Sequence, residues 1–559
     1  MAAPSIPLTL RNVKGSEVTV TEGDNNFTAL RSAIQQITVF TPAMFSILGN
    51  GTDETVKIQN MFNAAAGGII ICPAGLNFGF SAQIEIPQNT TILLNGSIFT
   101  RLTASTTHGF VIRENVSIDI FVVLTPGGSS GEKVCLITGS NVRIQRLSFV
   151  ATAEGSFTST NWGLEIDAGG SSFINNIWIG SARFKNYRTA IFAKRCSNLN
   201  VELLKVEFYR LAVFLQNVYE SKFGPADIAG KSTTLTGDPG ENGLLIESTT
   251  SSGASNNLVF NKWVVEDSGE HCFRLGGQLS INDVTFNECK ATRPGRSITV
   301  GYPSSVEWHG GCGFKALGAT LVTGQRHKNI YFNGCIAEDM SLQNGSFPAG
   351  HGINNFAGFQ IVACDNVHLN SCVIQKTALQ DYSAIKGFMF AACKGVYLNN
   401  CSANETRLTA LNPYEEAASF AGWNFGVEDL YVNGGKYEVS FPTAGQGLPM
   451  YVEGINWAHS KWRMTGVNFY GGGSPVRYNS PAGAGTYSDM TIDFTYSGSN
   501  ADDATTTVSL MPGATAAVIS GKMPWRPSAP VPAALNASLI QDTLGGTIRK
   551  KTGGTWTTV

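Results

Sequence analysis

The sequence predicts an all-β protein, a right-handed parallel β-helix built as a single-stranded solenoid, and three observations lead to this prediction. A seven-residue unit recurs through the middle of the chain, and a second short strand precedes most of its copies. Little helical periodicity lies between the copies. Glycine accounts for 62 of 559 residues and charged residues for only 14%, so internal repeats are the first feature to seek.

The repeated unit has the form x-h-x-h-N-x-C, in which h is apolar and a small residue can replace the cysteine. Its clear copies are NLVFNKW, DVTFNEC, NIYFNGC, NVHLNSC, GVYLNNC and DLYVNGG, which begin at Asn257, Asp283, Asn329, Asn366, Gly395 and Asp429. Weaker copies begin at Thr91, Asn115, Asn141, Asn176, Asn198, Asn217 and Lys461. Unequal spacing is expected of a solenoid, because loops lengthen on one side without disturbing the stack.

Two columns of identical residues follow if the copies stack as coils. The asparagines Asn261, Asn287, Asn333, Asn370, Asn399 and Asn433 would form a hydrogen-bonded ladder with one residue per coil. Two residues further on, Cys289, Cys335, Cys372 and Cys401 would form a second column. Metal ligands converge on one point, whereas this column runs in a line, so we expect reduced interior thiols and no metal site.

The ends of the chain differ from the repetitive middle. Residues 46–80 contain the one convincing helix of the core, with Val56, Ile58, Met61 and Phe62 at helical spacing, and we expect it to cap the open end of the solenoid. Residues 46–479 then form the β-helix, and residues 480–559 form a small β-rich region. Residues 1–45 are a separate leading segment that is too short for an independent enzyme domain.

Composition excludes several function classes. The net charge of −2 argues against a nucleic-acid-binding surface. The sequence contains no run of 18 apolar residues, which a membrane-spanning segment would need. The segment from Met1 to Lys14 lacks the pattern of a secretory signal. The eleven cysteines therefore suggest folding in a reducing cytoplasm, with free thiols.

Candidate chemistry lies on the outer surface, because the inside of a β-helix is packed. The cysteine column lies six residues after the first residue of each repeat and points inward. The residue nine positions after the start should then point outward, and the one ten positions after it lies at the turn. The outward position holds Glu207, Glu266, Thr292, Glu338, Gln375, Asn404 and Glu438. Beside it stand Asp227, Asp267, Arg293, Asp339, Lys376 and Glu405.

Two acidic pairs in this column are the predicted catalytic residues, namely Glu266 with Asp267 and Glu338 with Asp339. They lie two coils apart, roughly 10 Å between backbones, so their carboxyl groups fit the ~6.5–9.5 Å gap of an inverting glycosidase. Arg293, on the coil between them, would bind a sugar carboxylate or hydroxyl. The alternative is a solvated polar face without catalysis, since acids near turns often cap backbone groups.

Further substrate contacts are predicted in the long loops. Glu307, Trp308 and His309 could form a sugar-stacking wall with Arg296, and Tyr382 could join it. Glu270 and His271 are interpreted as part of a structural turn. Gly350-His351-Gly352 is similar to a polygalacturonase motif but lacks that family's other signatures in order.

Several segments resemble bacteriophage tailspikes that degrade surface polysaccharide, a group with pectate-lyase-like β-helices. They are GNGTDETVKIQ from Gly49, GGIIICPAG from Gly67, IEIP from Ile84 and VEDSGEHCFRLGG from Val265. In addition, Pro7 to Leu30 is similar to the short N-terminal segments of phage tail proteins. The resemblance implies a homotrimer that is made in the host cytoplasm and located on the virion. Its residues 1–45 would bind phage tail or baseplate proteins, and residues 480–559 would clamp the trimer or contact glycan.

The function implied by the resemblance is endo-cleavage of a bacterial capsule or O-antigen, and three alternatives stay open. Hydrolysis by the paired carboxylates is favoured, because no dense set of calcium ligands and no other cofactor site stands out. A polysaccharide lyase acting by β-elimination would need a base such as Lys376, His309 or Arg293. A non-catalytic adhesin would bind the glycan without cutting it.

Overall fold

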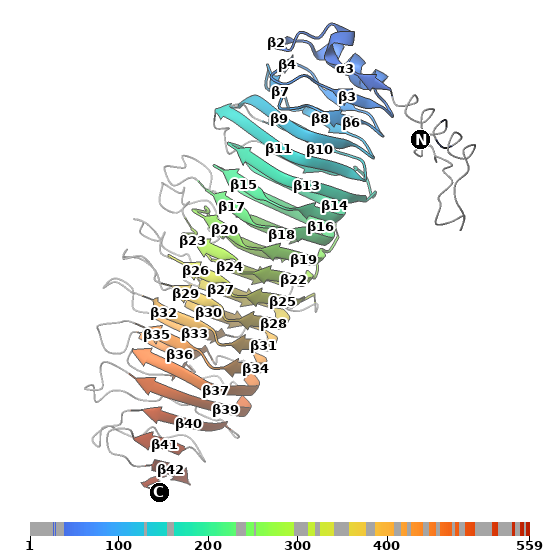
Figure 1. The fold of residues 1–559 in the computed structure, drawn as a ribbon. Coiled ribbons are helices and arrows are strands. Elements are labelled where there is room, and N and C mark those ends of the chain that lie inside the picture. The colour runs from blue at the N-terminus through green and yellow to red at the C-terminus, as the bar shows by residue number, and fades with distance from the viewer. Residues whose placement is uncertain are drawn as a thin grey trace.

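The computed structural model shows one continuous solenoid of short strands (Figure 1). It describes Asn26, Thr28 and residues 38–127, 131–153, 161–230, 242–250, 253–295, 311–318, 325–339, 357–375, 386–406, 415–421, 426–439, 447–453, 459–471, 476–479, 487–497, 517–523, 539–542, 548–552 and 555–558. Each complete coil contributes a strand to each of three sheets, in which neighbouring coils pair parallel. The predicted right-handed parallel β-helix is therefore confirmed.

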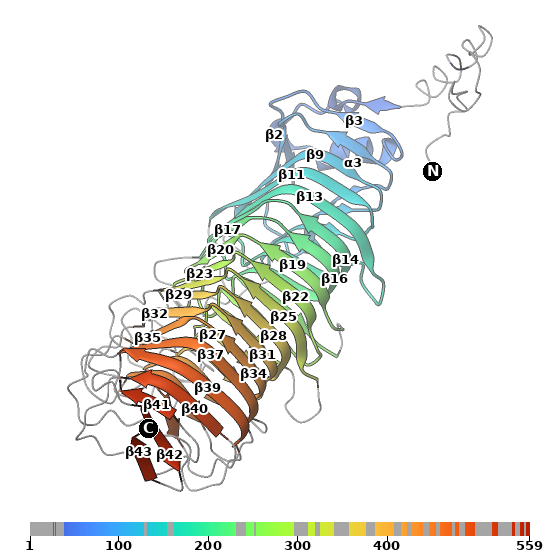
Figure 2. The ribbon, with the colours of Figure 1, turned by 60° about the horizontal axis from the view of Figure 1, so that its bottom comes forward.

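The three sheets run the length of the molecule (Figures 1 and 2). The first sheet contains β5 (Ile84–Ile86), β8 (His108–Ile112), β10 (Lys133–Ile137), β12 (Trp162–Ile166), β18 (Leu244–Ser248), β21 (Phe273–Gly277), β24 (Phe314–Leu317), β27 (Ala357–Val362), β30 (Lys386–Ala391), β33 (Glu415–Ala421), β36 (Gly447–Glu453) and β38 (Val476–Asn479). The second contains β1 (Val39–Phe40), β3 (Ile69–Ile71), β6 (Thr91–Leu93), β19 (Asn256–Asn261), β22 (Asn282–Asn287), β25 (His327–Asn333), β28 (Cys364–Asn370), β31 (Lys394–Asn399) and β34 (Glu428–Asn433). The third contains β2 (Asn50–Asp53), β4 (Asn77–Phe80), β7 (Ile98–Arg101), β15 (Leu204–Glu207), β17 (Ala226–Ala229), β20 (Trp263–Glu266), β23 (Lys290–Thr292), β26 (Ile336–Glu338), β29 (Val373–Gln375), β32 (Ser402–Thr406) and β35 (Lys436–Val439).

Longer strands bend from one sheet into the next. Those joining the first and second sheets are β14 (Thr189–Val201) and β16 (Leu211–Phe223). Those running from the second into the third are β9 (Ser117–Gly127), β11 (Val142–Ala153), β13 (Ile174–Lys185), β37 (His459–Gly471) and β39 (Tyr487–Ser497). Parallel pairing continues past residue 480 through β39, β40 (Ala517–Met523) and β41 (Leu539–Asp542). At the C-terminal end, β42 (Ile548–Thr552) pairs antiparallel with both β41 and β43 (Thr555–Thr558).

The division into segments 1–45, 46–479 and 480–559 stays a prediction. The expected C-terminal strand at Met490 to Tyr496 lies within β39, which extends the same stack of parallel coils. A second expected strand, over residues 505–510, falls outside the described residues. The parallel pairing of β39 with β37 means that the β-helix itself does not stop at residue 479.

A helix closes the N-terminal end of the solenoid, as predicted. A 3-10 turn, η1 (Pro42–Phe45), precedes α3 (Thr55–Ala64), and both lie above the first coils (Figure 1). The N-cap residue of the helix is Glu54, and Asp53 before it accepts hydrogen bonds at Oδ1 from the backbone N and the Oγ1 of Thr55 at 3.1 and 2.6 Å. Ile58, Met61 and Phe62 are buried against the solenoid core. Val56, predicted on the same face, is 73% exposed. It precedes Ile58 by two residues, about 200° around the helix, which places it toward solvent.

Asparagine ladders hold successive coils together on the outside of the second sheet. Asn287, Asn333, Asn370 and Asn399 each donate from Nδ2 to the Oδ1 of the asparagine one coil earlier, at 2.8–2.9 Å. This confirms the predicted ladder from Asn261 to Asn399. Backbone register extends the column to Asn433.

A second ladder, which the sequence analysis did not foresee, lies at the first residue of the repeat. It links Asn89, Asn115, Asn141, Asn176 and Asn198 at 2.8–3.0 Å, and again Asp283, Asn329 and Asn366 at 2.7–2.8 Å. All of these residues have φ between 54 and 61°. Asparagine and aspartate adopt this left-handed conformation more readily than most residues, which explains why the repeat begins with them.

Two weak copies of the repeat begin at other residues than the sequence pattern predicts. Thr91 pairs with Ser117, so that coil begins at Asn89, two residues before the predicted start. Phe223 pairs with Phe260, which aligns Glu220 with Asn257 and displaces the copy predicted at Asn217 by three residues. Glu220 has φ 49° and therefore occupies the left-handed position that asparagine or aspartate occupies in most coils.

The interior is a set of side-chain stacks. Cys289, Cys335, Cys372 and Cys401 lie one per coil and are fully buried, which confirms the interior column. All eleven cysteines are buried free thiols. Burial raises the pKa of Cys289 and Cys372, so these groups stay protonated and pack as small apolar side chains.

Interrupting the asparagine ladder should measurably weaken the solenoid. Asn333→Leu leaves the Oδ1 of Asn287 and the Nδ2 of Asn370 without their partners. We expect a loss of about 1–3 kcal/mol in the free energy of unfolding, followed by chemical denaturation. Asn200→Leu, on the same sheet but outside both ladders, is the control. Equal free energies of unfolding for the two variants would show that the hydrogen bonds of the ladder add nothing to the stability of the solenoid.

Candidate functional site

The predicted outward column is a continuous row at the edge of the third sheet. Register aligns Glu207, Ala229, Glu266, Thr292, Glu338, Gln375 and Asn404, one per coil. Asp227 does not belong beside this row, because it aligns with Lys205 and Val264 two residues earlier. The same displacement of the Asn217 copy causes this error.

The chain turns sharply just after the row. Asp267, Arg293 and Asp339 follow strands β20, β23 and β26 and have φ of 55, 50 and 52°. Backbone hydrogen bonds connect these turns, from Asp267 N to Thr292 O and from Arg293 N to Glu338 O, both at 3.1 Å. The three turns therefore stack, and an arginine lies between two acidic pairs as the repeat predicted. We call Glu266, Asp267, Lys290, Arg293, Glu338 and Asp339 the charged ridge.

Arg293 binds the acidic pair on the preceding coil. Its Nε and Nη2 contact the two carboxylate oxygens of Asp267 at 2.7 and 2.9 Å, and Nη2 also reaches Glu266 Oε2 at 3.2 Å. These hydrogen bonds raise the pKa of Arg293. About a third of the Arg293 and Glu266 side chains remains exposed, against 10% for Asp267. The predicted sugar-binding arginine is thus already engaged with two carboxylates in this structure.

Lys290 binds the acid on the following coil. Its Nζ lies 2.5 Å from Glu338 Oε2, and both side chains are about one third exposed. Lys290 and Arg293 belong to the same coil, so that coil supplies a cation to each side. Glu266 and Glu338 thus lie on either side of Thr292, each paired to a cation of the coil between them. Two coils separate their backbones by about 10 Å.

The other predicted contact residues lie outside the described residues, namely Arg296, Glu307, Trp308, His309, Tyr382, Lys376 and His351. Asp339 is partly buried at its turn. Glu270 and His271 are buried at the turn into β21, as a structural interpretation expects.

That turn leads into a second polar cluster on the outside of the first sheet. Arg274, Lys315, Gln360 and Met389 occupy one outward column in successive coils. Lys315 and Gln360 are only 6% and 3% exposed. Glu270, His271 and Cys312 pack beside them. The sequence signal was a cation in the middle of the apolar segments CFRL and GFKAL.

A histidine–carboxylate pair lies nearer the N-terminus on the same face. His108 Nε2 is 2.6 Å from Glu165 Oε2, and Lys133 Nζ is 3.6 Å from the same oxygen. Lys133 also lies 4.1 Å from the centre of the Trp162 ring. The repeat does not flag these residues, because they precede its clear copies. A single carboxylate without a second acid does not form a glycosidase pair.

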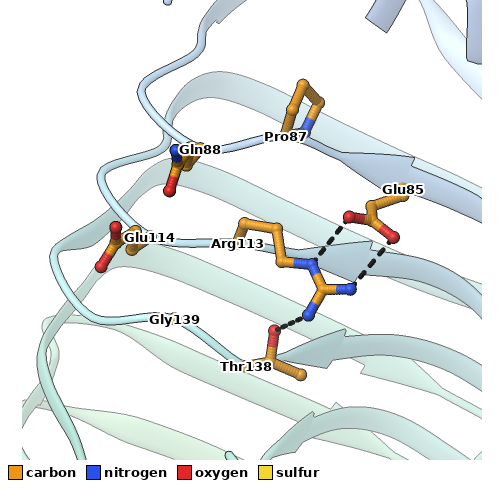
Figure 3. Close-up of a pocket in the computed structure, with 7 residues that line it drawn as sticks. All are labelled: Glu85, Pro87, Gln88, Arg113, Glu114, Thr138 and Gly139. Carbon is orange, nitrogen blue, oxygen red and sulfur yellow. Dashed lines mark hydrogen bonds and ion pairs between the residues drawn. The ribbon is translucent and has the colours of Figure 1, made fainter. Parts of the chain in front are cut away.

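A cavity of about 380 Å³ lies at the opposite edge of the first sheet (Figure 3). It is lined by Glu85, Pro87, Gln88, Arg113, Glu114, Thr138 and Gly139. Arg113 forms a two-pronged bond to Glu85 at 2.8 and 3.0 Å and contacts Thr138 at 3.3 Å. This cavity is several coils from the charged ridge, and its arginine is engaged by its own glutamate.

The described part of the chain lacks two features. No helix there is long and apolar enough to cross a bilayer. No three or more histidine, cysteine, aspartate or glutamate side chains there are grouped to hold a metal ion.

Proteins similar to this chain are found among solved structures. No protein-family model matches the chain. No curated protein sequence matches it. The A-module of the mannuronan C-5 epimerase AlgE6 from Azotobacter vinelandii is similar over 87% of this chain and 100% of its own, with 13% identity and a TM-score of 0.39. The N-terminal fragment of gene product 12 of bacteriophage Phi29 is similar over 92% and 97%, with 12% identity and a TM-score of 0.40.

A phage tailspike is also among the similar structures. Tailspike protein 3 of bacteriophage CBA120 is similar over 95% of this chain and 70% of its own, with 11% identity and a TM-score of 0.25. At such identities the likeness concerns the fold alone.

Proposed function

We propose that the protein is a phage tailspike that binds a bacterial surface polysaccharide and cleaves it internally by glycoside hydrolysis. The observation that carries this proposal is that Glu266 and Glu338 lie in one row two coils apart, each paired to a cation of the coil between them. Two carboxyl groups separated by one coil fit the wider spacing that an inverting hydrolase uses. The resemblance of residues 49–75 and 265–277 to tailspikes supports the choice of substrate class.

In the proposed reaction one acidic pair activates water and the other protonates the leaving group. Glu266 or Asp267, held by Arg293, accepts a proton from water as the water oxygen bonds to the anomeric carbon. Glu338 or Asp339 gives its proton to the glycosidic oxygen as the bond to that oxygen breaks. Arg293 and Lys290 fix the side chains, and the outer NH2 group of Arg293 (Nη1) remains available for a sugar hydroxyl.

The proposed assembly is a homotrimer on the virion. Residues 1–45 would attach it to tail or baseplate proteins, and residues 480–559 would clamp the trimer or contact glycan. Light scattering of the purified chain tests the trimer directly.

One observation favours a second candidate, a non-catalytic adhesin. Glu266, Asp267 and Glu338 all have a cationic partner, and a charge-paired ridge can bind sugar hydroxyls without cutting. The lyase alternative is less supported among the described residues, because Arg293 is bound to two carboxylates and is not disposed to accept a proton.

Incubation with a panel of purified capsules and O-antigens tests the proposal. We expect one polysaccharide to shorten with new reducing ends, and the first product to have an inverted anomeric configuration by nuclear magnetic resonance. Ultraviolet absorbance from an unsaturated sugar would instead establish a lyase. Binding without shortening would establish an adhesin.

A further inference from the structure

The cluster on the outside of the first sheet contains two adjacent basic side chains. Arg274 and Lys315 are direct partners in the parallel pairing of β21 and β24, about 4.8 Å apart along the backbone. Lys315 is 6% exposed, whereas a quarter of the Arg274 side chain is exposed. The cluster therefore opens to solvent at Arg274.

Arg274 has unused hydrogen-bonding capacity toward the interior of the cluster. Its Nη1 lies 3.7 Å from Glu270 Oε2, which is an ion pair but too long for a good hydrogen bond. Its Nε is buried and has no hydrogen-bond partner among the described residues. A buried unsatisfied donor is costly, and the planar arginine fork matches a carboxylate. The guanidinium thus has a donor for which the described residues provide no acceptor.

The hydrogen bonds of His271 indicate the protonation state of Lys315. The backbone N of Cys312 donates to His271 Nδ1 at 2.9 Å, so in the neutral ring the hydrogen must lie on Nε2. His271 Nε2 is 3.3 Å from Lys315 Nζ. An N–H group cannot accept a hydrogen bond from an ammonium group. The contact is a hydrogen bond only when Lys315 is a neutral amine that accepts it.

The surroundings agree with a neutral lysine. Burial lowers the pKa of Lys315, and the neighbouring Arg274 acts in the same direction. Glu270 and the Cys312 thiolate would act in the opposite direction. Burial raises the pKa of Cys312 to about 11, so this thiol carries no charge at neutral pH. Glu270 is then the one anion among the described groups that act on Lys315.

We propose that Arg274 and Lys315 form a binding site for the carboxylate of an acidic sugar, and that Lys315 takes up a proton when this carboxylate binds. The inference rests on the proposed function, because it makes the substrate an acidic polysaccharide. Glu270 is three residues beyond Asp267, so the site adjoins the charged ridge. A sugar carboxylate would satisfy the Arg274 Nε and supply the negative charge that a protonated Lys315 needs.

Proton uptake gives the binding a definite pH dependence. Without ligand, burial keeps the pKa of Lys315 low, and a bound carboxylate raises it. Between these two values, binding consumes a proton. Affinity is therefore greatest below the pKa of the free site and falls as pH rises above it.

Titration calorimetry with sodium glucuronate, in buffers of different ionisation enthalpy, tests the proposal on the full chain. We expect glucuronate to bind with net proton uptake, and glucose not to bind. Lys315→Met should abolish the proton uptake, and both it and Arg274→Gln should weaken binding about tenfold or more. Lys222→Met, at an exposed position on the second sheet, should bind as the unchanged protein does.

Each contrary result has a definite meaning. Glucuronate binding without proton uptake, unaltered binding by Arg274→Gln, or no glucuronate binding at all would overturn the proposal. Arg274 reaches solvent, so its variant remains informative if Lys315→Met does not fold. Because this assay measures binding of a monosaccharide, its failure leaves the cleavage of a neutral polysaccharide by the charged ridge intact.

Discussion

Glu266→Gln and Glu338→Gln are each expected to lose polysaccharide cleavage by a factor of about 10² to 10⁴ and to retain glycan binding. An amide has nearly the same shape as a carboxylate, but it neither accepts the proton from water nor donates one to the leaving oxygen. Initial rates of reducing-end formation measure the loss. A retained complex with uncut polysaccharide shows that the glycan-binding surface is intact.

Glu207→Gln is the matched control for these two variants. Glu207 occupies the same outward row and is also held by cations, with Arg183 at 2.9 Å and Lys205 at 3.5 Å. Register places Glu207 two coils from Glu266, across Ala229. Its two cations belong to the preceding coil and to its own coil, whereas Glu266 and Glu338 are each paired to a cation of the coil between them. We expect its cleavage rate to equal that of the unchanged protein. Full activity of both ridge variants would exclude the assigned site, and loss of activity in the control would mean that any charge change on this face impairs binding.

The fold was predictable because stacking makes sequence columns into spatial neighbours. Asn287, Asn333 and Asn370 recur at one place in the repeat, and the hydrogen bonds between them follow. Where a coil begins without asparagine or aspartate, as at Glu220, the residue type does not indicate which residue has the left-handed backbone conformation. Spacing alone then misplaces the copy, and the outward residues counted from it are misplaced as well.

The site was only partly predictable for a related reason. The alternation of side chains along a strand correctly predicted that Glu266, Thr292 and Glu338 lie in one outward row. It does not indicate which partner a long side chain selects, so the engagement of Arg293 by Asp267 was not foreseen. The alternation also suggests that every outward side chain meets water, whereas Lys315 on the first sheet is buried. Its environment depends on packing across coils, which the repeat does not encode.

The largest effect on stability is expected from Phe286→Ala. Phe286 is fully buried and stacks on Phe260 and Phe332, with ring centroids 5.2 Å away on either side. Phe273 and Phe314 pack edge-on against it from the first sheet, at 5.6 and 6.2 Å. Removing the ring leaves a cavity that rigid neighbouring coils cannot fill. We expect a loss of about 3–5 kcal/mol in the free energy of unfolding.

Tyr331→Ala separates the contribution of burial from that of stacking. Tyr331 belongs to the coil of Phe332 and stacks on His368 at 5.0 Å, but it lies on the outer face of the second sheet and is only partly buried. If burial dominates, this variant loses about 1 kcal/mol or less, because water replaces the ring. Equal losses in chemical denaturation would instead mean that ring stacking along the axis, inside or outside, is what holds the coils together. The large, desolvated interior of the solenoid argues for the first result.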